Sequence, residues 1–151
     1  LMIINRRGRR SHQTGVTMIE VLVAILVSVI GLFSVMKLQL TAVTNTHSSL
    51  SRSQAAIIAS GMVDQLRANS TAAVAGSYDL TLTGSVPTSG GLEVADLTQW
   101  RADLAATLPA GTGSVNCVSA TTICTLVVQW DDSRGLSGGT TQQFSLVVRL
   151  Q

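Results

Sequence analysis

The sequence has few charged and few aromatic residues. Charged residues occupy 12% of its 151 positions, and aromatic residues occupy 3%. A nucleic-acid-binding surface needs clustered basic residues and commonly aromatic ones, and this composition supplies neither. Hydrophobic residues make up 46% of the chain, a share typical of globular proteins, so the composition also excludes a disordered chain. We expect a single domain with an added membrane segment.

Histidine is scarce as well, with only His12 and His47, so a Ser–His–Asp site is not expected. We interpret His47 as a surface or packing residue, because no partner lies at metal-site spacing. The pair Gly138-Gly139 lacks the lysine of a phosphate-binding loop and reads as a hairpin tip. Asp131 and Asp132 could bind Ca²⁺ with backbone carbonyls, although paired acids in a turn are commonly just solvated. We therefore expect neither enzymatic activity nor a cofactor.

Charge is absent from residues 21–36, the sixteen-residue run VLVAILVSVIGLFSVM. With Val16–Ile19 included, the apolar stretch reaches 21 residues and is interrupted only by Glu20. About 20 apolar residues in a helix span the hydrocarbon core of a bilayer. The sequence therefore predicts a membrane-spanning helix that carries one acidic residue near its start.

Basic residues are concentrated before this run. From Val16 onward the chain has six basic and eight acidic residues, whereas four arginines precede it: Arg6, Arg7, Arg9 and Arg10. Membrane proteins keep such basic clusters on the cytoplasmic side. This bias places the rest of the chain across the membrane, in the periplasm of a Gram-negative cell.

Three other N-terminal signals fit parts of this pattern. A cleaved secretory signal has a shorter apolar core and a small-x-small cleavage site, whereas KLQLTAVTN follows the run here. A twin-arginine export signal needs apolar residues directly after the arginine pair, where this chain has SHQTG. An unprocessed single-span anchor fits the length and charge but leaves Glu20 unexplained.

A short basic leader that ends in glycine, followed by an apolar helix with glutamate five residues later, resembles the class III signal of type IV pilins. The motif here is GVTMIE, residues 15–20. The resemblance implies that a prepilin peptidase cuts between Gly15 and Val16 and methylates the new amino group of Val16. Val16 stands where phenylalanine or methionine is usual, and Lys37 stands where many major pilins have proline. The second difference fits minor pilins better than major ones.

The position of Glu20 has a physical interpretation within this resemblance. A carboxylate in hydrocarbon costs about 2.5–3.5 kcal/mol near a helix centre. Cleavage after Gly15 creates an α-amino group, whose pKa of about 8 makes it cationic at neutral pH, four positions before Glu20. The pair can form within one helix or between staggered helices, where it sets the axial offset of subunits. The alternative is an acid at a helix end that reaches the membrane surface.

Helical spacing continues after the apolar run and predicts one helix over Thr17–Asn69, about 80 Å long at 1.5 Å per residue. Its second half is expected to present an apolar stripe to a small domain: Val43, His47, Leu50, Gln54, Ile57 or Ile58, Gly61 or Met62, and Leu66. Residues 70–95 read as a Gly/Ser/Thr-rich connector with one short strand, Tyr78–Gly84.

The C-terminal third reads as a helix followed by strands. Asp96–Pro109 predicts a short helix whose apolar face is Leu97, Trp100, Leu104 and Leu108. Strands are predicted at about 113–118, 124–130 and 143–150, and Phe144, Leu146, Val148 and Leu150 alternate with Ser145, Val147 and Arg149 in the last. The fold class is α+β and pilin-like: one long N-terminal helix, membrane-spanning in its first half, packed on a small antiparallel β-sheet.

Cys117 and Cys124 flank a predicted turn between two strands. In an oxidising periplasm, two nearby cysteines in a small domain favour a disulfide. Free thiols and a metal site remain as alternatives, although a metal site lacks two further ligands.

The domain plan follows: a basic leader over residues 1–15 that is removed, a membrane-spanning or filament-core half-helix over 16–37, an amphipathic half-helix over 38–69, and a periplasmic α+β domain over 70–151. The pattern LTQWRADLAATLPAGTGSV-C, then WDDSRG and a closing F-LVVRL, resembles the PilV group of minor pilins. RSQAAIIASGMVDQLRANS in the long helix extends this resemblance over nearly the whole chain.

The resemblance implies a minor pilin of a type IV pilus, a structural subunit that takes part in assembly, priming and the tip complex, with roles in cell adhesion and twitching motility. The implied partners are other minor pilins, the major pilin, a pilus-tip adhesin, the prepilin peptidase and the inner-membrane assembly platform. The implied location is the inner membrane, in a single pass with the C-terminal domain in the periplasm, and then the pilus tip. Alternatives are a minor pseudopilin of a type II secretion system, a DNA-uptake receptor pilin and an anchored periplasmic enzyme.

Overall fold

The computed structural model of the chain describes residues 15–135 and 138–150. The chain divides into two compact units, one ending at Gln39 and one beginning at Leu40. The leader expected over residues 1–15 lies, except for Gly15, outside the described residues. The elements in chain order are α1 (Met18–Ala68), α2 (Ser70–Val74), α3 (Leu92–Thr107), β1 (Thr112–Val118), β2 (Ile123–Trp130) and β3 (Gln142–Arg149).

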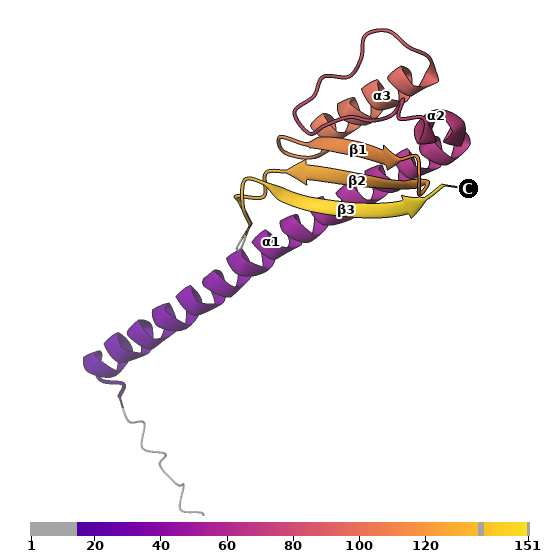
Figure 1. Ribbon diagram of the computed structural model, residues 1–151. Helices are drawn as coiled ribbons and strands as arrows, with labels where there is room; N and C mark the ends of the chain where they lie inside the picture. The colour runs from indigo at the N-terminus through magenta and orange to yellow at the C-terminus, as the bar shows by residue number, and fades with distance from the viewer. Residues whose placement is uncertain (1–14, 136–137, 151) are drawn as a thin grey trace, which may run out of the picture. The chain divides into compact units, whose positions relative to one another are not determined.

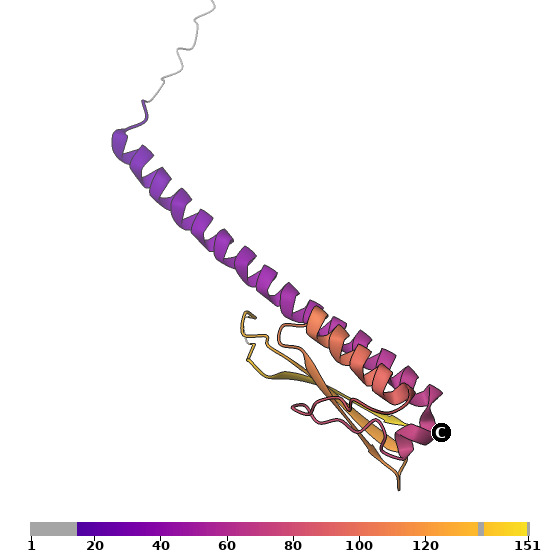
Figure 2. The ribbon, with the colours of Figure 1, turned by 90° about the horizontal axis from the view of Figure 1, so that it is seen from above.

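The α+β fold class that the sequence predicts is confirmed, because the second unit packs a helix on an antiparallel sheet with the strand order β1-β2-β3. The C-terminal half of α1 and the whole of α3 lie side by side on one face of this sheet (Figure 1, Figure 2). Every second side chain of β2 is buried beneath these helices. The alternate side chains of β2 are half-buried, and no described helix covers their side of the sheet, the open face. All three strands lie within one residue of their predicted ranges.

The face that α1 buries differs in part from the predicted stripe. Met62 and Leu66 are buried as expected and Ile58 packs against the core, but three other stripe positions are exposed: Val43, His47 and Leu50. The buried residues of α1 are Ala55, Ala59, Met62, Val63 and Leu66. Alanine has the smallest side chain that can line a helix face, so this choice lets the helix lie close to the sheet.

The segment 78–84 is not the strand that its alternating pattern predicts. It meets the sheet at one bridge, where Leu80 and Val115 of β1 exchange backbone hydrogen bonds of 2.8 and 2.9 Å. Directly after the bridge, the carbonyl oxygen of Thr81 accepts a hydrogen bond from the guanidinium of Arg101 at 2.6 Å. The next carbonyl that a longer strand would pair with β1 is that of Leu82, because facing alternates along an antiparallel strand. It accepts a hydrogen bond from the hydroxyl of Thr112 at 2.9 Å instead.

Helix α3 begins at Leu92, directly after Gly90-Gly91, and not at the predicted Asp96. Glu93 lies in its first turn, and its carboxylate accepts a hydrogen bond from the backbone N–H of Gly91 at 2.8 Å. That backbone bond keeps the pKa of Glu93 below its usual value. The predicted apolar face is confirmed, because all four of its residues are buried: Leu97, Trp100, Leu104 and Leu108.

A buried tyrosine joins three segments of the second unit. Tyr78 has no exposed surface. Its hydroxyl donates to Asp96 Oδ2 at 2.6 Å and accepts a hydrogen bond from Asn69 Nδ2 at 3.2 Å. Burial, followed by the hydrogen bond to Asp96, raises the pKa of Tyr78 to about 12. The network fixes the connector between the end of α1 and the start of α3.

Tyr78 is the only tyrosine in the chain, so tyrosinate absorbance reports on it alone. We expect a titration midpoint of about 12 in the folded protein and about 10 in denaturant. Because the unfolded chain ionises first, the free energy of unfolding should fall between these pH values, by roughly 2–3 kcal/mol in total.

Tyr78→Phe is the control for this titration. It should lack the pH-dependent fall in this window and should be less stable at pH 8 by about 1–2 kcal/mol, because Asp96 and Asn69 lose their shared partner. A native midpoint near 10 would contradict the buried network.

Candidate processing and docking site

The two residues of the expected cleavage site lie in exposed, non-helical backbone. Gly15, Val16 and Thr17 are all exposed, and α1 begins directly after them at Met18. A Cβ atom added at Gly15 would meet nothing within 4 Å. The chain itself therefore imposes no need for glycine here, and the bond between Gly15 and Val16 is open to a second protein.

Glu20 lies in the first turn of α1. The backbone N–H groups of Glu20 and Val21 donate to the carbonyl oxygen of Thr17 at 3.0 and 3.3 Å. The positive end of the helix dipole favours an acid at this position by about 0.3–1 kcal/mol. Within residues 15–135 and 138–150, the Glu20 carboxylate has no hydrogen bond and no ion pair. Its charge is available to a partner outside this chain.

Val16 and Glu20 border the same shallow depression on the surface of the first unit. The remaining lining residues are small or apolar: Val21, Ala24, Ile25, Ser28 and Val29. Cleavage before Val16 would place a cationic amino group at the rim of an apolar surface that already holds one carboxylate. The sequence spacing of four residues between Val16 and Glu20 thus corresponds to a shared surface in the structure.

The helix that follows is apolar on all sides. Among the described residues, α1 is the one helix long and apolar enough to cross a membrane, judged by length and composition. Its large apolar side chains are uncovered; Leu22 is 63% exposed and Phe33 is 68% exposed. The hydroxyl groups of Ser28 and Ser34 donate to carbonyl oxygens one turn earlier, at 2.7 and 2.9 Å. These polar groups need no water, which suits a helix in lipid.

Residues 10–36 match the family model described as the prokaryotic N-terminal methylation motif. The matched segment contains Gly15, Val16, Glu20 and the apolar run up to Met36. No curated protein and no solved structure matches the chain. The motif supports a prepilin of the type IV pilin or pseudopilin class, and together with the apolar helix it fits a membrane-anchored subunit that assembles with other pilins.

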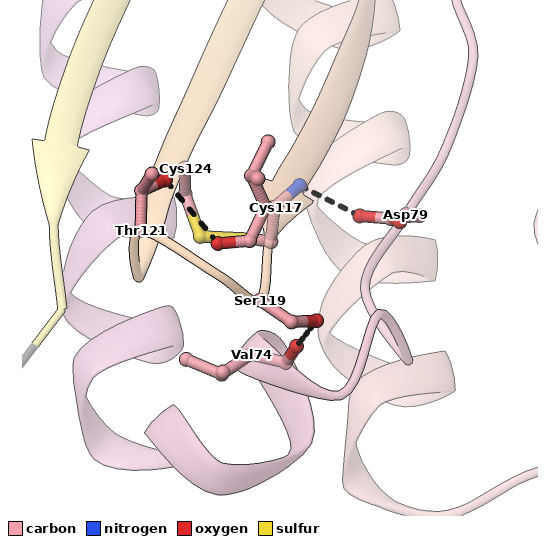
Figure 3. Close-up of a disulfide and its surroundings, with 7 residues drawn as sticks. Val74, Asp79, Cys117, Ser119, Thr121 and Cys124 are labelled. Carbon is pink, nitrogen blue, oxygen red and sulfur yellow. Dashed lines mark hydrogen bonds between the residues drawn. A yellow bond between two sulfur atoms is a disulfide. The ribbon is translucent and has the colours of Figure 1, made fainter.

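A disulfide joins Cys117 of β1 to Cys124 of β2, which lie directly opposite each other in the sheet (Figure 3). The backbone N–H of Cys117 donates to Asp79 Oδ1 at 2.8 Å. In the turn that follows, Ser119 Oγ donates to the carbonyl oxygen of Val74 in α2. The disulfide and these bonds secure one end of the sheet. Sequence reasoning missed Asp79, since its partner lies 38 residues away.

The remaining residues considered as ligands make ordinary structural contacts. His47 is exposed on α1. Asp131 accepts a hydrogen bond from the backbone N–H of Ser133 at 2.8 Å, which lowers the pKa of Asp131 below its usual value. Asp132 Oδ1 accepts a hydrogen bond from Ser48 Oγ at 3.1 Å, so the loop after β2 is tied to α1. In the part of the chain that the structure describes, no three metal-ligating side chains gather.

The first prediction for this site concerns processing. Protein extracted from membranes should begin at Val16, with or without a methyl group on its amino nitrogen, as read by intact-mass analysis. Gly15→Ala should be cut at nearly the wild-type rate, whereas Gly15→Glu should remain uncut because a large charged side chain obstructs the peptidase. Thr17→Ala is the matched control and should be cut normally. A mature chain that starts after the apolar run would refute the prepilin motif.

The second prediction concerns the disulfide. Replacing both Cys117 and Cys124 with alanine should lower the free energy of unfolding of the second unit by about 2–3 kcal/mol, since the link closes a short loop. Val118→Ala, at an exposed neighbouring position, should change the stability little. Denaturant titration followed by tryptophan fluorescence measures both. Equal stability of the double variant and the wild type would show that the sheet does not depend on the link.

Proposed function

We propose that the chain is a minor pilin of a type IV pilus, of the PilV group, and that it takes part in priming assembly and in the tip complex. The single observation that carries the proposal is the unpaired carboxylate of Glu20 in the first turn of an otherwise apolar helix. It lies beside the position where cleavage at the matched motif would create an amino terminus. The α+β domain that follows has the pilin-like arrangement of a helix packed on an antiparallel sheet.

The energies favour a docking role over a tolerated acid. A carboxylate in hydrocarbon costs about 2.5–3.5 kcal/mol near a helix centre, whereas the helix dipole returns only about 0.3–1 kcal/mol. An ammonium group from a neighbouring subunit offsets the remainder. Because an unpaired buried charge is penalised strongly, such a pair selects one axial offset between subunits. Glu20 thus acts as a positioning residue for assembly and has no catalytic part.

Location and partners follow from this role. Residues 16–37 anchor the subunit in the inner membrane, the domain lies in the periplasm, and the subunit then moves into the pilus near its tip. Its partners are the prepilin peptidase, the assembly platform, other minor pilins, the major pilin and a pilus-tip adhesin. The continuous helix through Lys37, where many major pilins have proline, supports a minor pilin.

A minor pseudopilin of a type II secretion system is the second candidate, because the matched methylation motif serves both classes. Neighbouring genes separate the two. Genes for a tip adhesin and further minor pilins support a pilus, whereas a secretion operon with its secretin supports a pseudopilus.

The test of the proposal is the charge at position 20. Glu20→Ala and Glu20→Gln should still be cleaved and inserted, because the helix becomes more apolar and Gly15 is intact. Both should be depleted from sheared pili by about tenfold or more, because the partner's ammonium loses its counter-charge. Glu20→Asp should be intermediate. The comparison is between membrane and pilus fractions, with each variant expressed beside wild-type partners.

Ile25 borders the same depression as Glu20. Ile25→Ala is therefore the matched control, since it alters the apolar surface without changing the charge. It should enter pili normally. Glu20→Ala in pili at the wild-type level would show that Glu20 is only an acid at the membrane surface.

A further inference from the structure

The two edge strands of the sheet, β1 and β3, differ in whether their outward backbone groups have hydrogen-bond partners. On the outer edge of β1, Leu80 pairs with both backbone groups of Val115, at 2.8 and 2.9 Å. The next outward N–H along this strand, that of Cys117, donates to the Asp79 carboxylate at 2.8 Å. Segment 79–80 therefore caps this edge, and no further strand can pair there without displacing it.

Among the residues that the structure describes, no segment pairs with the outer edge of β3 (Figure 1). The residue directly after β3, Leu150, faces β2, because its N–H donates to the carbonyl oxygen of Thr122 at 2.8 Å. Residues of an antiparallel pair alternate between facing the partner strand and facing away. The backbone N–H and C=O groups of every second residue of β3 therefore point outward, away from β2: Gln143, Ser145, Val147 and Arg149. Within the described chain, none of these outward backbone groups has a hydrogen-bond partner.

This edge also lacks the features that usually prevent strand pairing. Natural edge strands are protected by proline, lysine, bulges or short length. β3 has the sequence QQFSLVVR, with no proline and no lysine, and its single charge is at the end, on Arg149. Its register against β2 is unbroken from Gln142 to Arg149. β3 is thus a long, regular and uncapped edge strand, whereas β1 at the opposite edge of the sheet is capped.

We propose that β3 accepts an extended strand from a different protein chain, which continues the sheet. The row of outward N–H and C=O groups specifies an extended backbone as the occupant. On the helix side, a groove runs between α1 and β3, lined by Ser60, Val63, Asp64, Arg67 and Leu146–Val148. Alternate side chains of the incoming strand would enter it beside half-buried Phe144, Leu146 and Val148. The partner segment is therefore extended, with apolar residues at every second position.

A second copy of this chain does not meet the same requirement. Antiparallel pairing of two β3 edges needs a half-turn about an axis normal to the sheet, which reverses the α1 helix that lies along the sheet. Subunits of a helical filament contact one another head to tail, so two copies do not pair through the same β3 edge. A head-to-tail copy would offer its β1 edge, which is capped. This exclusion rests on the proposed assembly function, whereas the open edge rests on the second unit alone.

The experiment uses the full chain in cells that express its native neighbours, with a photo-crosslinking benzophenone amino acid at Val147. Val147 is 63% exposed beside the open edge. The probe is compared in two backgrounds, Ser145→Pro and Ser145→Ala. Proline removes the outward N–H of residue 145 and places its ring at the edge, while the bonds to β2 remain because that N–H does not face β2. Alanine keeps the N–H and is the matched control.

We expect one adduct with another protein in the wild type and in Ser145→Ala, with its yield reduced about tenfold or more in Ser145→Pro. The same probe at Asn116, on the open face beside the capped edge, should give no such adduct. An adduct that persists in Ser145→Pro would overturn the proposal, because the partner would then bind a face and not the edge. An adduct of twice the mass of this chain, or none at Val147, would also overturn it.

Hydrogen exchange keeps the proposal testable if Ser145→Pro fails to fold. In the wild-type chain purified alone, the amides of Gln143, Ser145 and Val147 should exchange rapidly while that of Leu146 is protected. In the complex isolated from membranes, all four should be protected. Rapid exchange of the outward amides in that complex would overturn strand addition. This readout does not depend on whether the complex is a pilus, so its outcome is separable from that of the Glu20 variants.

Discussion

The first half of α1 needs a cover that the described chain does not provide. Sixteen large apolar side chains between Val16 and Leu38 are exposed. Fully burying a side chain of this kind contributes about 1.5–3 kcal/mol. Covering the set with lipid or with other helices therefore contributes tens of kcal/mol, against about 2.5–3.5 kcal/mol for one carboxylate. The cost of one carboxylate therefore does not prevent burial of this helix. In the proposed docking role, Glu20 instead determines the position of the helix along its neighbours.

The second half of the same helix meets a different demand. There, Ala55 and Ala59 face the sheet, and the domain closes around them with Trp100 and Leu104 of α3. The end of the sheet at the turn between β1 and β2 is secured by the disulfide and by Asp79. The connector between α1 and α3 is secured by the Tyr78 network. These contacts join the helices, the connector and the sheet of the second unit, whereas the β3 edge is uncapped within the described residues. One helix thus combines a segment that requires a foreign environment with a segment that carries a folded domain.

Much of this could be predicted from the sequence, because it depends on local periodicity. The span of α1, the face of α3 and the three strands follow from apolar spacing, and the motif around Gly15 is contiguous. The predictions from the sequence were wrong where residues far apart in the chain decide the local structure. The choice of Ala55 over Leu50 as a core residue depends on how closely the helix approaches the sheet. The early end of the strand at 78–84 depends on Thr112, whose hydroxyl takes the carbonyl of Leu82. The difference between the two sheet edges depends on register. Neither is visible in the local sequence pattern.

The pairing of Glu20 with a neighbour's amino terminus is the central claim, and zero-length cross-linking tests it most directly. Pili assembled from a mixture of isotopically light and heavy subunits are treated with a membrane-permeant carbodiimide, which joins a carboxylate only to an amine in contact with it. Mass spectrometry of the digest should show an amide between Glu20 of this chain and the N-terminal residue of another subunit, with mixed isotopic labels. A Glu20 that stays unlinked, or that links only within its own chain, would contradict the account.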